Sequence, residues 1–327
     1  MKRIAVELYG LTRNYESAFD SFFINFLQPL YYDGYTVDVF IHTWSKSDTD
    51  DVTWHNPTGE NRGKDVQNKE IQDIIEKYRP KKIIIDKPFD IAKEIVIKEK
   101  LANHSRTYNS IISCFYSRYK VNELRKEYQK EQEITYDWVI QTRFDISFDK
   151  PFSIDFYQKI YMQHCKISAN KSDIFTAYSP WRMCSMADSE NIECYTDIIL
   201  YSTPESIDKI TEFYPDLKNG NIDIQFINEN IYSLEVLWKK YWKLKGIEHI
   251  KLKYIEGEDY HIVRHPSENN AFQPAPIKKY KTRINNNLKA IWLYFKPVFS
   301  WFSEIFSVIF YALKILLKSL ERLKRCI

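Results

Sequence analysis

The segment from Tyr136 to Asp149, YDWVIQTRFDISFD, constrains the fold of this chain more than any other stretch. Its first half is rich in β-branched and aromatic residues and is hydrophobic on both faces, which is typical of a strand buried in a sheet. Arg143, Asp145 and Asp149 then follow at its carboxyl end. Open α/β sheets bind their ligands at the carboxyl ends of the strands. The segment therefore predicts a central strand and, at its end, a candidate site.

Two interpretations of Arg143 and Asp145 stay open. In the first, the Asp145 carboxylate holds a divalent cation or a diphosphate, and the Arg143 guanidinium forks onto phosphate oxygens. In the second, the two side chains form an ion pair where the strand reaches the surface, an interaction of small energy. Polar strand ends that recur upstream favour the first interpretation.

Predicted strands and helices alternate through the first half of the chain. The expected strands are Ile4–Tyr9, Val37–Trp44 and Lys81–Phe89, and the expected helices follow the turn Gly10–Glu16 and cover Glu70–Tyr78 and Asn103–Gln132. Beyond the central strand we expect short strands at Ile160–Lys166, Ser172–Tyr178, His249–Tyr254 and His261–Arg264, and an aromatic-rich helix through Trp238 and Trp242. The alternation predicts an α/β fold with a mostly parallel, Rossmann-like sheet flanked by helices.

Polar residues also follow the first two predicted strands. Arg13 lies in the turn between a strand and a helix, where it can meet an anionic ligand at the helix amino end or remain a solvated loop residue. His42 and Trp44 end the second strand. A histidine there is either a ligand-binding group or part of a hydrogen-bonded structure. Trp44 either stacks on a nucleotide base or is simply buried.

The composition excludes several classes of site. The chain has seven glycines and contains neither GxGxxG nor GxxxxGK[ST], the two commonest nucleotide-binding fingerprints. Its five cysteines form no CxxC pair and no cluster with zinc-site spacing, a pattern of a reducing compartment. Its 327 residues suffice for one large α/β domain with an appendage.

The chain from Ile277 onward is strongly basic. It holds eleven Lys and Arg residues against Glu304 and Glu321, whereas the whole chain carries a formal charge of +3. The part before Ile277 is therefore net acidic. This asymmetry favours a tethered enzyme or adaptor over a nucleic-acid-binding protein.

The segment Leu288–Leu323 is the most apolar part of the chain, and its polar residues recur every three or four positions. It can be a core helix, a membrane-spanning helix or a helix in the membrane plane. Glu304 and Lys314 would lie in hydrocarbon if it spanned, so we favour in-plane attachment to an anionic lipid surface. The predicted organisation is a domain over residues 1–268, a basic linker over 269–287 and an amphipathic membrane helix over 288–327. The protein is expected on the cytoplasmic side of a membrane, as a peripheral or monotopic protein.

Four motifs in succession resemble those of bacterial and viral glycosyltransferase-like proteins of surface-polysaccharide synthesis. They are GLTR at Gly10–Arg13, DVFIHTW at Asp38–Trp44, YDWVIQTRFD at Tyr136–Asp145 and SDIFTAYSPWRM at Ser172–Met183. The resemblance covers Ile4 to Arg264 in order. It implies a GT-A-like fold and an enzyme that moves a sugar from a nucleotide-sugar donor to a lipid-linked or surface-glycan acceptor.

The GT-A fold also implies a metal site, because a D-x-D triplet at a strand end there holds Mn²⁺ or Mg²⁺ and the donor diphosphate. The resemblance matches Asp145 to the last acid of that triplet, whereas Arg143 stands in place of the first. Either the guanidinium itself neutralises the diphosphate, or a cation relies on Asp145, water and phosphate oxygens. Asp145 is then the expected catalytic and metal-binding residue, and Arg13, His42, Trp44 and Arg143 are the expected donor-binding residues.

A base for the acceptor hydroxyl is expected if the reaction inverts the sugar configuration. Asp173 and Asp223 are the candidates. Asp223 lies where a helix begins, so capping of that helix competes with ligand contact. The loss of the first acid of the triplet supports an alternative function, a non-catalytic membrane adaptor that has kept the fold.

Overall fold

The computed structural model describes residues 2–47, 63–88, 105–179, 195–223, 225–227 and 234–263. Contacts between Cα atoms divide the chain into a unit from Met1 to Arg264 and a second from His265 to Ile327. The linker predicted over 269–287 and the membrane helix predicted over 288–327 lie outside the described residues. The described residues all belong to the first unit.

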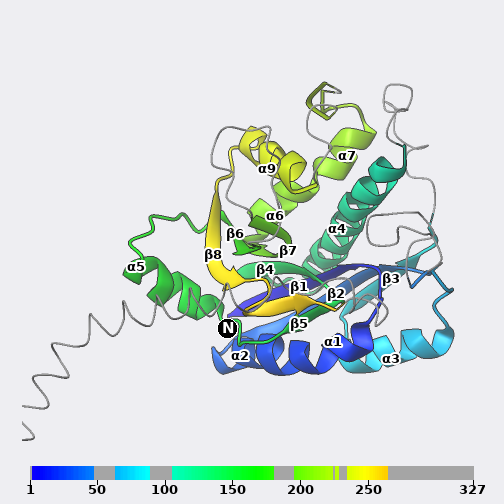
Figure 1. Cartoon of the computed structure of the whole chain (residues 1–327), viewed down its shortest axis with the longest axis horizontal. Helices are drawn as coiled ribbons and strands as arrows, with labels where there is room; N and C mark the ends of the chain where they lie inside the picture. Colours follow the sequence, from blue (N-terminus) through cyan, green and yellow to red (C-terminus); the bar gives the residue numbers. More distant parts are fainter. Residues whose placement is uncertain are drawn as a thin grey trace, which may run out of the picture. The chain divides into compact units, whose positions relative to one another are not determined.

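The chain forms an α/β fold around a mixed, mostly parallel sheet, as predicted. Its seven strands lie in the order β3-β2-β1-β4-β7-β6-β8 (Figure 1). Their bounds are β1 Arg3–Gly10, β2 Thr36–Trp44, β3 Lys82–Asp86, β4 Trp138–Arg143, β6 Ile174–Tyr178, β7 Tyr195–Ser202 and β8 His249–Ile255. The strands β3, β2, β1 and β4 are parallel, β7 is antiparallel to β4 and β6, and β6 is parallel to β8.

Helices cover both faces of the sheet. One face carries α1 Tyr15–Ser21, the π-helix η1 Phe22–Leu27, α2 Gln28–Tyr32 and α3 Asn68–Tyr78. The other carries α4 Ser105–Glu131, α6 Pro204–Thr211, α7 Phe213–Lys218 and α9 Leu234–Leu244 (Figure 1). This arrangement explains why β1, β2 and β4 are hydrophobic on both faces, since each face of the sheet meets a helix layer.

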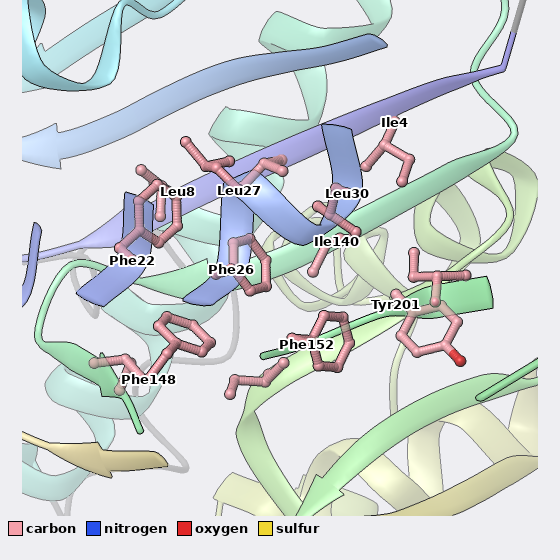
Figure 2. Close-up of a cluster of buried hydrophobic side chains, with 14 of the residues drawn as sticks. Ile4, Leu8, Phe22, Phe26, Leu27, Leu30, Ile140, Phe148, Phe152 and Tyr201 are labelled. Carbon is pink, nitrogen blue, oxygen red and sulfur yellow. The ribbon is translucent and has the colours of Figure 1, made fainter. Parts of the chain in front are cut away.

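Alternate residues of β1 enter two separate hydrophobic clusters. Ile4 and Leu8 join a cluster with the aromatic residues of η1, and Figure 2 shows Leu8 beside Phe22. Tyr9 joins the opposite cluster, with side chains of α4 and α9. The first strand is therefore fixed from both sides, and so is the position of the turn that comes after it.

The order of strand addition creates a switch point beside β1. The chain places β2 and β3 on one side of β1 and then crosses over to place β4 on the other. At the carboxyl ends, Tyr9 pairs with Arg143 of β4 and Gly10 pairs with Thr43 of β2. Ligands of open α/β sheets bind at such a reversal of strand order.

Two predictions about the second half of the chain were wrong or incomplete. The strand expected at Ile160–Lys166 is helical, formed by the π-helix η5 Phe156–Tyr161 and by α5 Met162–His164. Tyr157 and Met162 are buried there while Phe156 and Ile160 are exposed, which is helical spacing. The strand β7 was not expected at all, although its sequence YTDIILYS has strand character.

The predicted segment Tyr136–Asp149 divides into two strands. After β4 a turn at Phe144 and Asp145 leads into β5, Ile146–Phe148, which leaves the main sheet. β5 pairs in antiparallel fashion with β9, Tyr260–Ile262, to form a two-stranded ribbon. Within the described part of the chain, no helix has both the length and the apolar character needed to cross a membrane.

Candidate functional site

Three residues singled out in the sequence lie together at the switch point. Asp145, in the turn after β4, is 2% exposed. Its Oδ1 accepts a hydrogen bond from Arg143 Nε at 2.9 Å, and its Oδ2 accepts one from Arg143 Nη2. Arg13, in the turn after β1, places its Nε 3.4 Å from the same Oδ2. The pair predicted at the end of β4 is therefore joined by the arginine predicted at the end of β1.

The charge of this arginine cluster, defined as Arg13, Arg143 and Asp145, is positive. Burial by itself lowers the pKa of Arg143, but the Asp145 carboxylate raises it above the usual value, so Arg143 is charged. Two guanidiniums against one carboxylate leave a net charge of +1. The arginine side chains are 24% and 22% exposed, whereas that of Asp145 is 3% exposed. The cluster thus presents cationic groups to solvent over a buried anion that holds them in place.

The turn that carries Arg13 has a residue of positive φ on either side of Thr12 and Arg13. Gly10 has a φ of 95°, and apart from its two chain neighbours no atom lies within 4 Å of the place where a Cβ would stand. Asn14, the N-cap of α1, has a φ of 56° and donates its side-chain N–H to the Val263 carbonyl at 2.9 Å. Glycine permits close approach of a ligand to the backbone, and the helix amino end favours negative charge. The GLTRN turn therefore places Arg13 at the cluster from the β1 side.

His42 is the centre of a buried hydrogen-bonded chain that ends at Gly10. Its Nε2 lies 3.1 Å from Asp86 Oδ2, and its Nδ1 lies 2.7 Å from Ser117 Oγ. Ser117 Oγ accepts the Gly10 N–H at 2.8 Å, and the Tyr116 hydroxyl donates to Asp86 at 2.6 Å. Both ring nitrogens of a neutral His42 have a hydrogen-bond partner if Nε2–H donates to Asp86 and Nδ1 accepts the Ser117 hydroxyl proton. Since His42 is 0% exposed, it positions the Gly10 turn and has no surface for direct ligand contact.

Replacing His42 by glutamine is expected to make the free energy of unfolding depend less on pH at acidic pH. Burial lowers the pKa of His42 below its ordinary 6.5, so the unfolded chain takes up a proton that the folded chain does not. The free energy of unfolding of the wild type therefore falls as pH drops below 6.5, by at most about 2 kcal/mol between about pH 7 and pH 5. Urea unfolding of wild type and His42→Gln at the two pH values measures this difference. Equal slopes for both proteins would contradict the assignment.

Trp44 is buried beside this chain of hydrogen bonds. It is 6% exposed, stacks on Tyr116 with ring centroids 5.4 Å apart, and meets the His42 ring edge-on. The alternative of simple burial therefore accounts for Trp44. Asp86, whose side chain is 29% exposed, is the outermost polar group of this region. Its pKa is lowered to about 2, mainly by the hydrogen bond from His42, so it is a carboxylate at neutral pH.

The two candidate bases do not join the arginine cluster. Asp173 precedes β6, and β6 runs parallel to β4, so Asp173 lies at the amino edge of the sheet, opposite to Asp145. It is 7% exposed and accepts the Asn170 N–H at 2.8 Å. Asp223 is exposed and accepts the Gln225 N–H at 2.9 Å, the capping contact that competed with ligand binding. Neither residue is therefore part of the candidate site.

The residues of the cluster do not fit a divalent cation. Both oxygens of Asp145 accept hydrogen bonds from the Arg143 guanidinium, and Arg13 pairs with Oδ2, so a cation would face two positive charges for one carboxylate. Divalent cations of this kind take several oxygen ligands. Among the described residues, no group of three or more His, Cys, Asp or Glu side chains is arranged to hold a metal. The arginine cluster therefore does not match the Mn²⁺ or Mg²⁺ site that the GT-A resemblance implies.

A second buried network lies under the switch point, on the α4 side of the sheet, and no motif or spacing in the sequence indicates it. Glu7 of β1 is 0% exposed and accepts from Arg125 Nε at 3.2 Å and from Gln141 Nε2 at 2.7 Å. Arg118 lies between the rings of Tyr9 and Trp238, 3.9 and 4.0 Å from their centroids. Helix α4 thus contacts β1 and β4 through two buried arginines seven positions apart, Arg118 and Arg125.

No family model matches this chain, and no curated protein matches it.

Proposed function

We propose that this protein is a glycosyltransferase that moves a sugar from a nucleotide-sugar donor to a glycan or glycolipid acceptor, on a GT-A-like scaffold. The observation that carries the proposal is the pair of guanidiniums, Arg13 and Arg143, held by Asp145 at the switch point of a parallel sheet. This is the place where α/β sheets bind nucleotides. Arginine is also the side chain best suited to phosphate oxygens.

The chemistry of the transfer asks for stabilisation of the leaving nucleoside diphosphate. Negative charge develops on the diphosphate as its bond to the sugar breaks, and fixed cationic donors at that point lower the barrier. Arg13 and Arg143 supply these donors, and Asp145 keeps them in position before the ligand arrives. Asp145 is thus a positioning residue in the proposed site. Its expected catalytic and metal-binding roles are replaced by this one.

The test is release of nucleoside diphosphate from a panel of UDP-, GDP- and dTDP-sugars by the full-length protein, with and without bacterial glycolipid extract. Turnover of at least one donor, stimulated by the extract, is expected. Binding of a donor with no release in either condition would favour the membrane adaptor that has kept the fold and lost turnover. Absence of both binding and release would overturn the proposal.

The proposal includes attachment to a membrane through residues 288–327, on the cytoplasmic side. The full chain is expected to sediment with vesicles that contain phosphatidylserine. A shortened chain that ends at residue 287 is expected to stay in solution. The attachment rests on apolar burial together with Lys and Arg on anionic lipid, each contributing on the order of 1 kcal/mol. Sedimentation of the shortened chain with the vesicles would contradict this assignment.

A further inference from the structure

A histidine and an aspartate form an exposed pair on the ribbon of β5 and β9. His261 Nδ1 lies 2.8 Å from Asp149 Oδ2, and the two side chains are 50% and 41% exposed. His261 stands opposite Ser147 in the antiparallel register. The pair is therefore held by two strands and open to solvent.

The ribbon brings this pair to the arginine cluster. Ile146 and Phe148 are each 1% exposed and belong to the hydrophobic core. Because successive side chains of a strand point to opposite faces, Ser147 faces away from this core, and Asp145 and Asp149 directly precede and follow the strand. The Val263 N–H donates to the Asp145 carbonyl at 2.8 Å, which extends the ribbon to the cluster.

The strand register places His261 two positions along the ribbon from Val263, whose N–H donates to the Asp145 carbonyl. His261 pairs with Ser147, which lies two residues beyond Asp145, or about 7 Å along the strand. Asp173 lies at the other edge of the sheet, and Asp223 caps a backbone N–H. The His261–Asp149 pair is thus the candidate base on the ribbon that begins directly after Asp145.

The hydrogen bond to Asp149 sets the chemistry of the imidazole. A carboxylate accepts from a ring N–H, so Asp149 selects the tautomer with the proton on Nδ1. Nε2 then carries the lone pair and is the acceptor for a substrate proton. A carboxylate that orients a histidine in this way also stabilises the imidazolium that forms when the proton arrives.

We propose that His261 is the general base of the transfer and that Asp149 is its positioning residue, an inference that rests on the proposed function. The acceptor hydroxyl oxygen forms the new bond to the anomeric carbon while the bond from that carbon to the diphosphate oxygen breaks. The hydroxyl proton passes to His261 Nε2, and the leaving nucleoside diphosphate keeps the bonding electron pair beside Arg13 and Arg143. A single displacement of this kind inverts the anomeric configuration.

The experiment compares wild type with His261→Gln, Asp149→Asn and the control His164→Gln, which replaces an exposed histidine of α5. Each protein is titrated with inorganic pyrophosphate and then assayed for nucleoside diphosphate release from UDP-, GDP- and dTDP-sugars across a pH series. His261→Gln is expected to keep the pyrophosphate affinity and to lose about 100-fold or more in release rate, the usual contribution of a general base. The acid-side fall of the wild-type rate should disappear in this variant, and Asp149→Asn should lower the release rate without changing the pyrophosphate affinity.

The outcomes separate this inference from the proposed function. A wild type that binds no pyrophosphate and releases no nucleotide overturns both. Turnover that His261→Gln retains, or a product with retained anomeric configuration, overturns the base assignment alone. A wild type that binds pyrophosphate yet releases nucleoside diphosphate from none of the donors overturns the transferase proposal and the base assignment with it.

Discussion

Replacing Arg143 by alanine is expected to weaken binding of inorganic pyrophosphate by about 10- to 150-fold. The variant removes one of the two guanidiniums at the switch point, and a hydrogen bond to a charged group contributes about 1.5–3 kcal/mol. Arg143→Lys keeps the charge but loses the planar fork, so its affinity is expected to fall between those of wild type and Arg143→Ala. Isothermal titration calorimetry of the three proteins measures the series.

The control for that series is Lys2→Ala. Lys2 has a side chain 47% exposed and immediately precedes β1, at the opposite edge of the sheet from the cluster. This substitution removes the same charge and should leave the pyrophosphate affinity unchanged. Because Arg143→Ala also leaves the buried Asp145 with one partner fewer, circular dichroism at the titration temperature shows whether the variant is folded. Equal affinity of folded Arg143→Ala and wild type would remove Arg143 from the proposed site.

Replacing Arg125 by methionine is expected to destabilise the fold by about 3–5 kcal/mol, because it leaves a buried carboxylate without its cation. Arg125 is 1% exposed and contacts Glu7, Asp208 and Asn122. Burial already raises the pKa of Glu7 to about 7 even with Arg125 beside it. Without Arg125 that pKa should rise further, so the loss of stability should be larger at alkaline than at acidic pH. Urea unfolding at two pH values measures both effects.

Two further variants sharpen this prediction. Lys126→Met changes the neighbouring residue of α4, whose side chain is 45% exposed and pairs with the exposed Glu123. Its effect should stay below about 0.5 kcal/mol. The double variant Glu7→Leu with Arg125→Met removes both charges and should recover part of the loss. A single variant Arg125→Met as stable as Lys126→Met would show that the network does not hold β1 to α4.

Much of the fold is readable from the sequence because its strands are unusually hydrophobic. The segments that became β1, β2 and β4 are buried on both faces, so their composition alone indicates a covered parallel sheet. The polar residues at their carboxyl ends must then meet at one edge, and Arg13, Arg143 and Asp145 do so. Local sequence sufficed here because strand direction alone decides which edge these residues share.

Long-range pairing is not readable from the sequence in the same way. The strand β7 enters the sheet antiparallel between β4 and β6, and without it the position of Asp173 was undetermined. The strands β5 and β9 have three residues each, too few for a periodic signal. Their pairing brings His261 to Asp149, and spacing in the sequence carries no trace of that contact.

The burial of His42 and Trp44 is a related case. Both end a predicted strand, and both were expected at the donor. Helix α4 covers them. Its Ser117 hydroxyl is hydrogen-bonded to the His42 ring, and its Tyr116 ring stacks on Trp44. Whether a strand end is open or covered depends on which helix packs there. The composition of the strand does not indicate which helix packs at its end.

The most direct test of the proposed site is a crystal structure of the full-length protein with a nucleoside diphosphate, using UDP and GDP in separate soaks. We expect the phosphate oxygens within hydrogen-bonding distance of both Arg13 and Arg143, with Asp145 still holding the two guanidiniums. A diphosphate bound at another surface, away from Arg13 and Arg143, would contradict the proposed donor site.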